Sequence, residues 1–287
     1  MKKPIFTPAR LAGFLAIALM ISCETEETDA VETSQEEVIT TAELQFSDES
    51  ELISEEVVQI AEDVYLQDEI ALMAKSAYNS DYLPECVTIT TVVTDLTREK
   101  TIDFGGGCEL PNGNVLAGII TMTYAKDPEL AQKTISLNLT DFSFNGVGVQ
   151  GSASILRQRS NESGNPQSTV NANYTISWPS GESASFSGNR TREWVEGVGT
   201  GFWGDNVILI EGSATYTGRA GNTYTKEITQ TLRRELSCRF IVSGVVTFSR
   251  NANSVSLDFG DGSCDAKGIF TNAEGESQEV FLRRFGK

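Results

Sequence analysis

The chain contains the same short segment twice, each time at the end of a run of alternating β-branched residues. The segment reads Asp-Phe-Gly, followed by a second glycine and a cysteine, and it occupies 103–108 and 258–264. Another cysteine precedes each run, Cys86 in the first copy and Cys238 in the second. Alternation with a period of two, interrupted by a polar break, is typical of two paired strands. Each copy is therefore predicted to be a β-hairpin.

The two cysteines of each copy lie at equal distances from the predicted turn. Their midpoint is Thr97 in the first copy and Asn251 in the second, and both residues lie in polar segments that favour turns. Residues equidistant from the turn of an antiparallel hairpin lie opposite one another, which selects one of the three pairings that four cysteines allow. The predicted disulfides are Cys86–Cys108 and Cys238–Cys264. Reduced, buried thiols are the alternative, and a metal site is weaker still because the chain has no histidine.

The Asp-Phe-Gly segment has two further interpretations. Protein kinases use this tripeptide to bind magnesium, but no glycine-rich phosphate loop, catalytic loop or partner lysine accompanies it here. Calcium could bind to Asp258, Asp261 and Asp265, because calcium takes several carboxylate oxygens. The spacing is not that of an EF-hand, and the first copy lacks two of the three aspartates. A glycine-rich turn explains the segment better, since glycine adopts positive φ without a Cβ penalty.

The N-terminus has the features of an export signal. Residues 1–10 contain two lysines and an arginine, and 11–21 form an apolar run too short to span a bilayer. The run ends in Ser-Cys23, which resembles the lipobox of bacterial lipoproteins, although Met20 departs from the commonest pattern. We therefore expect a signal peptide over 1–22 and an acylated Cys23. An ordinary signal peptide that leaves a free thiol is the alternative.

Negative charge is concentrated before the first hairpin. Residues 24–85 contain 19 acidic residues and one basic residue, Lys75, for a net charge of −18. Residues 86–287 contain 21 acidic and 18 basic residues, for a net charge of −3. Since phosphate and anionic lipid repel such an arm, nucleic acid is not expected as a partner. Residues 23–48 are predicted to form a disordered acidic tether that holds the folded domain off the membrane.

A short helical segment is predicted over 49–80. Two apolar sets follow helical spacing, and they are out of phase by about half a turn. The sets are Ile53, Val57, Ile60 and Val64, then Leu66, Ile70, Met73 and Ala77. We therefore expect a break or a change of docking face near 65–68. The helices are expected to pack on the β-domain, and recognition of a partner is the alternative.

The remainder, 86–287, is predicted to be one antiparallel β-domain with two pseudo-repeats. Turn signals recur about every 12 to 20 residues, and no helical crossover interrupts the strands. The fold class is mainly β, a large up-and-down sheet or sandwich, with an open barrel as the alternative. Alternation such as that over 134–140 predicts one wet face and one packed face. Nearly all of this region is expected to be strand and turn, and examples of the strands are 115–124, 134–144, 147–157, 168–178, 207–217, 223–236, 239–249, 255–259, 268–272 and 279–283.

Candidate site residues are few. Without histidine, Ser-His-Asp and Cys-His catalysis and histidine-ligated metals are excluded. Glu193 and Glu196 form a carboxylate pair beside aromatic residues, which could hydrolyse or bind a sugar. Tryptophans could form a platform on which sugar rings stack: Trp178, Trp194 and Trp203. Tight strand bends with buried rings are the preferred explanation of this region, and no cofactor is expected.

Together these segments resemble uncharacterised cell-envelope lipoproteins of the Bacteroidota. The resemblance rests on the lipobox, the acidic run after Cys23, and the Asp-Phe-Gly hairpin repeated at 103–108 and 258–264, each followed by a glycine and an alternating strand. It covers the leader and most of 86–287. It implies an outer-membrane, lipid-anchored and surface-exposed protein, or one facing the periplasm, and it implies no chemistry.

The expected function is non-enzymatic. The leading hypothesis is a lipoprotein anchored in the outer membrane that binds a glycan or a protein through its β-domain. A structural or assembly component of the envelope that engages a partner through 49–78 is the alternative. A glycosidase using Glu193 and Glu196 is third.

Overall fold

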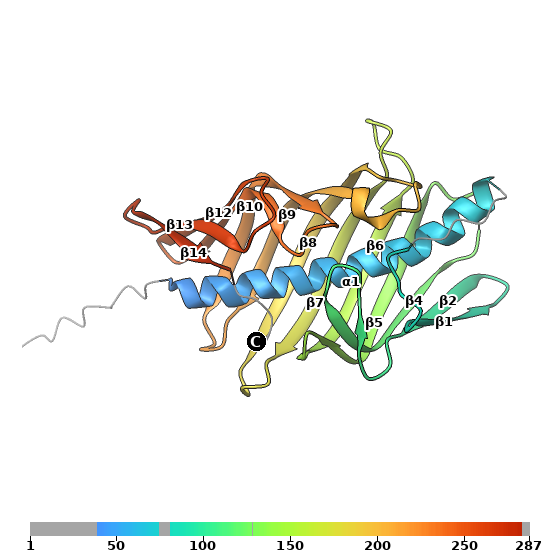
Figure 1. Ribbon diagram of the computed structural model, residues 1–287, viewed down its shortest axis with the longest axis horizontal. Helices are drawn as coiled ribbons and strands as arrows, with labels where there is room; N and C mark the ends of the chain where they lie inside the picture. The colour runs from blue at the N-terminus through green and yellow to red at the C-terminus, as the bar shows by residue number, and fades with distance from the viewer. Residues whose placement is uncertain (1–38, 75–80, 128, 283–287) are drawn as a thin grey trace, which may run out of the picture. The chain divides into compact units, whose positions relative to one another are not determined.

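The computed structural model describes residues 39–74, 81–127 and 129–282, and its strands form one open antiparallel sheet. The sheet has 14 strands in the order β1-β2-β4 and then consecutively to β14, with β3 paired to β4 (Figure 1). The strands are β1 (Thr88–Val93), β2 (Thr97–Asp103), β3 (Cys108–Glu109), β4 (Val115–Ala125), β5 (Gln132–Phe144), β6 (Val147–Gln158), β7 (Gln167–Ser177), β8 (Ser183–Glu196), β9 (Val207–Thr217), β10 (Thr223–Glu235), β11 (Ile241–Arg250), β12 (Asn253–Asp261), β13 (Lys267–Thr271) and β14 (Ser277–Phe281). The predicted up-and-down, mainly β architecture is confirmed.

Strand β8 was not among the predicted strands. Its buried positions include glycine, two arginines and Trp194, and its exposed positions are three serines, Asn189 and Glu196. Basic residues on the packed face hide the usual apolar alternation from sequence analysis. The run 193–205, in which tight strand bends are predicted, is the end of β8, a loop and a short 3-10 helix, Trp203–Asp205.

One helix, α1 (Thr41–Ala74), lies across the strands on one face of the sheet (Figure 1). The predicted break near 65–68 is wrong, because the helix is continuous. It also begins earlier than predicted, so 41–48 belong to the helix and not to a tether. Four successive residues, Val57 to Ile60, are 0% exposed. Successive helical residues point about 100° apart, so α1 is covered on all sides over these middle turns.

Both predicted hairpins and both disulfides are present. Cys86 bonds Cys108, and Cys238 bonds Cys264. The first hairpin pairs β1 with β2 and the second pairs β11 with β12.

The repeated Asp-Phe-Gly segments also adopt the same local structure. The Asp103 carboxylate accepts a hydrogen bond of 2.8 Å from the Gly105 amide, and Asp258 accepts one of the same length from Gly260. The phenylalanine between them is buried in both copies.

Segments associated with the two hairpins meet beside the middle of α1. Tyr82 and Asn112 both donate hydrogen bonds to the buried Glu56 carboxylate. Arg239, next to a cysteine of the second hairpin, donates a bond of 3.2 Å to Asn114. Through these contacts, the segments around Tyr82 and Asn112 cover the part of the helix that the sheet leaves open.

Candidate functional site

The face of the sheet that contacts α1, here called the inner face, pairs buried cations with buried carboxylates. Every buried acidic residue of the described chain lies on the helix, and every buried basic residue lies on a strand. The buried cations are Lys100, Lys133, Arg157, Arg190, Arg192, Lys226 and Arg234. The buried carboxylates are Glu43, Asp48, Glu49, Glu51, Glu55, Glu56, Glu62, Asp63 and Glu69.

Arginine side chains of β8 bind the helix most extensively. Arg190 binds both carboxylate oxygens of Glu51, at 2.7 Å each. Arg192 bonds Glu55 at 2.8 Å, donates to Gln59 at 2.9 Å and pairs with Glu62. Bidentate and charge-assisted bonds of this kind are stronger than neutral ones. They fix the position of α1 along the inner face.

Two buried carboxyl groups in the N-terminal half of α1 have pKa values that are shifted in opposite directions. Burial alone would raise the pKa of Glu51, but Arg190 and Lys226 lower it to about 2. Burial raises the pKa of Asp48 to about 7, even though Lys226 opposes the shift. The inner face therefore holds Glu51 as a carboxylate and favours the protonated form of Asp48.

This arrangement corrects the expectation of a disordered acidic tether over 41–48, which belong to α1, and residues 49–74 pack on the β-domain as expected. Their carboxylates neutralise cations of the β-domain instead of facing solvent. Arg190 and Arg192 lie at alternate, buried positions of β8, and the spacing of these two arginines is the signal by which the sequence could have indicated the pairing. An unpaired cation is rarely buried, so such a position requires an acidic partner from elsewhere in the chain.

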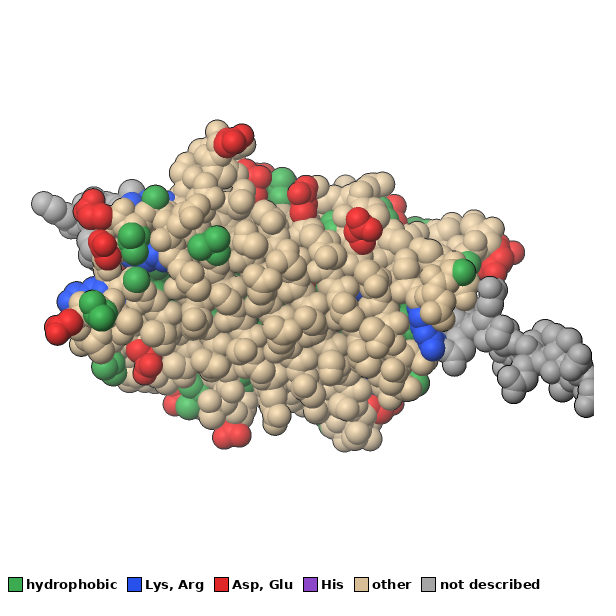
Figure 2. All heavy atoms as spheres, turned by 180° about the vertical axis from the view of Figure 1, so that it is seen from behind, with side chains coloured by type: hydrophobic (Ala, Val, Ile, Leu, Met, Phe, Trp, Pro, Cys, Tyr) green, Lys and Arg blue, Asp and Glu red, His purple; other side chains and the backbone are tan. Residues whose placement is uncertain are grey.

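The opposite, outer face of the sheet is polar and almost free of charge. Figure 2 shows this face from behind, with charged and hydrophobic side chains confined largely to its rim. One residue from each of eleven strands lies in register across it. These residues, called the hydroxyl–amide row, are Thr90, Thr101, Thr121, Asn138, Ser152, Asn173, Ser187, Thr215, Thr225, Ser249 and Ser254. All of them are at least partly exposed.

A groove of about 510 Å³ lies in the middle of the outer face. Asn173, Ser187 and Thr215 of the hydroxyl–amide row line it. The complete lining is Gln150, Gly151, Asn173, Tyr174, Thr175, Ser185, Phe186, Ser187, Thr215 and Thr217, without a charged residue. Phe186 and Tyr174 are buried, and their rings belong to the core. The groove therefore presents hydroxyl and amide groups.

A second hollow of about 420 Å³ lies on β9 and β10, lined in part by Glu211, Gly212 and Glu227. Glycine is needed beside both hollows. A Cβ on Gly151 would lie 2.1 Å from the carbonyl oxygen of Asn173, and one on Gly212 would lie 2.3 Å from that of Asn189. Both glycines have positive φ, 130° and 119°. Only glycine lets adjacent strands approach this closely, so these positions fix the local form of the outer face.

The tryptophans do not form an external platform. Trp178 and Trp194 are only 3% and 2% exposed, and both belong to the hydrophobic core. Trp178 also donates a hydrogen bond of 2.9 Å to Glu49 of the helix. Trp203 is half-buried and packs near Tyr82. The tryptophan rings therefore stabilise the interior. This agrees with the interpretation of the region as strand bends with buried rings.

The carboxylates proposed for a glycosidase are held by other groups. Glu193 accepts hydrogen bonds from Asn161 and Asn165, which lower the pKa of its carboxyl group. Glu196 pairs with Arg233 at 3.1 Å. A general acid needs a raised pKa, so this environment does not favour acid catalysis by Glu193.

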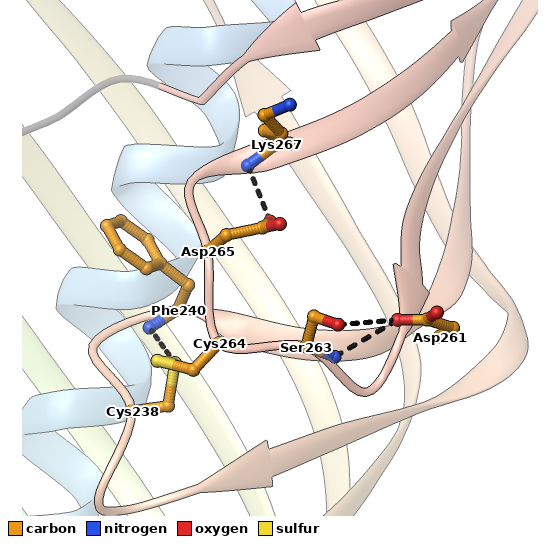
Figure 3. Close-up of a disulfide and its surroundings, with 7 residues drawn as sticks. All are labelled: Cys238, Phe240, Asp261, Ser263, Cys264, Asp265 and Lys267. Carbon is orange, nitrogen blue, oxygen red and sulfur yellow. Dashed lines mark hydrogen bonds between the residues drawn. A yellow bond between two sulfur atoms is a disulfide. The ribbon is translucent and has the colours of Figure 1, made fainter.

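The three aspartates of the second hairpin serve as turn caps. Asp258 caps Gly260, Asp261 accepts bonds from the Ser263 amide and hydroxyl, and Asp265 accepts one from the Lys267 amide. Figure 3 shows Asp261 and Asp265 directed at these separate groups beside the disulfide. Within the described ranges, no cluster of acidic or cysteine residues could hold a metal ion. The calcium interpretation is not supported.

The predicted lipidation site, Cys23, lies outside the described residues. Among the residues that the structure describes, no helix is long and apolar enough to cross a membrane. Comparison with known proteins finds no matching family model, curated protein or solved structure. The function must therefore be argued from the residues themselves.

Proposed function

We propose that this chain is an outer-membrane lipoprotein, exposed at the cell surface, that binds a glycan or a protein without catalysing a reaction. The leader and Cys23 support the lipid anchor, and the acidic run after Cys23 supports surface export. The outer face of the sheet is the binding surface. The observation that carries the proposal is the hydroxyl–amide row, which spans eleven strands and is not used in the core.

The placement of the charges supports a binding role for the outer face. Six of the seven buried cations and most of the carboxylates of α1 form ion pairs inside the protein, so these groups stabilise the fold. Because α1 is enclosed over its middle turns, the helix has no free face there for a partner. This argues against a partner site on these turns of the segment 49–78, and it favours the polar outer face as the binding surface.

The test of this proposal compares binding to cell-envelope fractions. The chain with Cys23→Ser, which removes the acylation site, is incubated with the fractions and sedimented. Asn173→Arg places a long cation in the groove and is expected to abolish binding. Ser163→Arg changes an exposed loop away from the groove and serves as the matched control. Equal binding by both variants, or no binding by the parent chain, would refute the proposed role of the outer face.

The anchor and its orientation are tested separately on the native protein. Mass spectrometry of the protein from native membranes should find diacyl or triacyl modification on Cys23. Antibody labelling of intact cells should reach the folded domain. Labelling only after the outer membrane is opened would place the domain in the periplasm instead.

A further inference from the structure

The chemistry of the groove identifies one class of ligand. We propose that the outer face binds an uncharged carbohydrate chain, held in the groove around Asn173 and Ser187 and continuing along the hydroxyl–amide row. This inference rests on the proposed function. It narrows the proposed ligand from a glycan or a protein to an uncharged glycan.

The groove can form hydrogen bonds with the hydroxyl groups of a ligand, and it has no charged side chain that could form an ion pair. Its exposed lining side chains are serine, threonine, asparagine and glutamine. Hydroxyl and amide groups both donate and accept hydrogen bonds, as do the hydroxyl groups of a sugar. An anionic ligand would find no cation among the lining residues. In the neighbouring hollow, Glu211 and Glu227 would accept bonds from sugar hydroxyls and repel an anion.

A protein partner would find no anchor in the same groove. The centres of protein interfaces are enriched in aromatic residues, methionine and arginine, which contribute most of the binding energy. The only aromatic residues of the groove, Tyr174 and Phe186, are 3% and 1% exposed. A lipid surface would likewise find no exposed apolar patch there. A neutral polyhydroxylated ligand is the class that remains.

The polar groups of the groove are held in place before a ligand binds. The Ser187 hydroxyl donates a bond of 2.7 Å to the Asn173 side-chain oxygen, and Asn189 bonds Asn171 at 2.7 Å one row away. Among the described residues, the hydroxyls of Ser152 and Thr215 make no hydrogen bond and remain available. Side chains fixed on rigid strands lose little conformational entropy on binding.

The extent of the surface favours a polymer over a single sugar. Residues of the hydroxyl–amide row follow one another at the spacing of adjacent strands, about 4.8 Å. The second hollow adjoins the first along β9, where Ser213 lies two residues from Thr215, a distance of about 7 Å. A chain that occupies both hollows makes several weak contacts at once, so its affinity should exceed that of its monosaccharide.

The test uses an array of neutral polysaccharides (glucans, mannans, xylans and galactans) and anionic ones (alginate, pectate and hyaluronate). The chain with Cys23→Ser is expected to bind at least one neutral polymer at both low and high salt, because no ion pair is involved. Loss of two hydrogen-bonding groups in Asn173→Ala/Ser187→Ala should weaken binding by about tenfold. Ser163→Arg should bind as the parent does. Retention by anionic polymers only, or by no neutral polymer, would overturn the inference.

Treatment of the envelope fractions separates this inference from the proposed function. Periodate destroys the vicinal diols of glycans, and protease destroys protein ligands. Binding that is lost with periodate and survives protease supports a glycan. Binding that survives periodate and is lost with protease overturns the carbohydrate ligand but leaves a binding role for the outer face. Absence of any binding to the envelope refutes the proposed function as well.

Discussion

Replacement of Arg192 by methionine should cost more stability than any other change on β8. Arg192 is fully buried, and its guanidinium contacts Glu55, Gln59 and Glu62 on successive turns of α1. Methionine has a similar length but leaves two buried carboxylates without this cation. Removing one partner of a buried ion pair typically costs about 3–5 kcal/mol. We expect a loss of that size in the free energy of unfolding of Arg192→Met.

Urea unfolding followed by circular dichroism measures this loss, and two further variants make the result specific. Arg233→Met removes an arginine whose side chain is 33% exposed and pairs with surface carboxylates, and it should cost less than about 1 kcal/mol. Arg192→Met combined with Glu55→Gln and Glu62→Gln should recover much of the stability, because no charge is then left unpaired. A loss below about 1 kcal/mol for Arg192→Met alone would refute the claim that the helix is held through buried charge.

Three other changes test separate parts of the structure. Burial raises the pKa of Asp48 from 3.8 to about 7, so the folded state binds the proton more tightly and stability falls as pH rises through this window. Asp48→Asn should therefore increase the free energy of unfolding more at about pH 8 than at about pH 5, by about 2 kcal/mol, and an equal gain at both pH values would contradict the shift. Cys238→Ser/Cys264→Ser opens a loop of 26 residues and should lower stability by about 3 kcal/mol, which thermal unfolding with and without reductant can check. Gly151→Ala places a Cβ 2.1 Å from a carbonyl oxygen of β7 and should cost about 1–3 kcal/mol, whereas Gly106→Ala, which meets nothing within 4 Å, should be neutral by the same assay.

The local features of the fold follow from the sequence. Each disulfide joins residues only 22 or 26 positions apart, across a hairpin whose turn and alternation are encoded in the intervening residues. Strand β5 likewise shows the expected alternation, with Ile135 and Leu137 buried and their neighbours exposed. Such elements depend on side-chain periodicity and turn chemistry within a short window, so they can be predicted without knowing the rest of the chain.

Contacts between distant segments could not be predicted in this way. Arg192 and Glu55 are 137 residues apart, and nothing near either residue identifies the other. The acidic composition of 41–74 is typical of a solvated arm when it is considered alone. It becomes part of the core only because strands such as β8 and β10 present cations at alternate, inward positions.

For the candidate binding face too, some features follow from the sequence and others only from the tertiary structure. The sequence alone determines that the wet face of each strand is rich in serine, threonine and asparagine. The export signal that ends at Cys23 stays a prediction from the sequence. The sequence does not determine which of the polar residues lie side by side. Register across eleven strands aligns them into one row, and the burial of Trp178 and Trp194 removes the aromatic alternative. Only tertiary structure decides both, because strand register and ring burial are set by packing against α1 and the neighbouring strands.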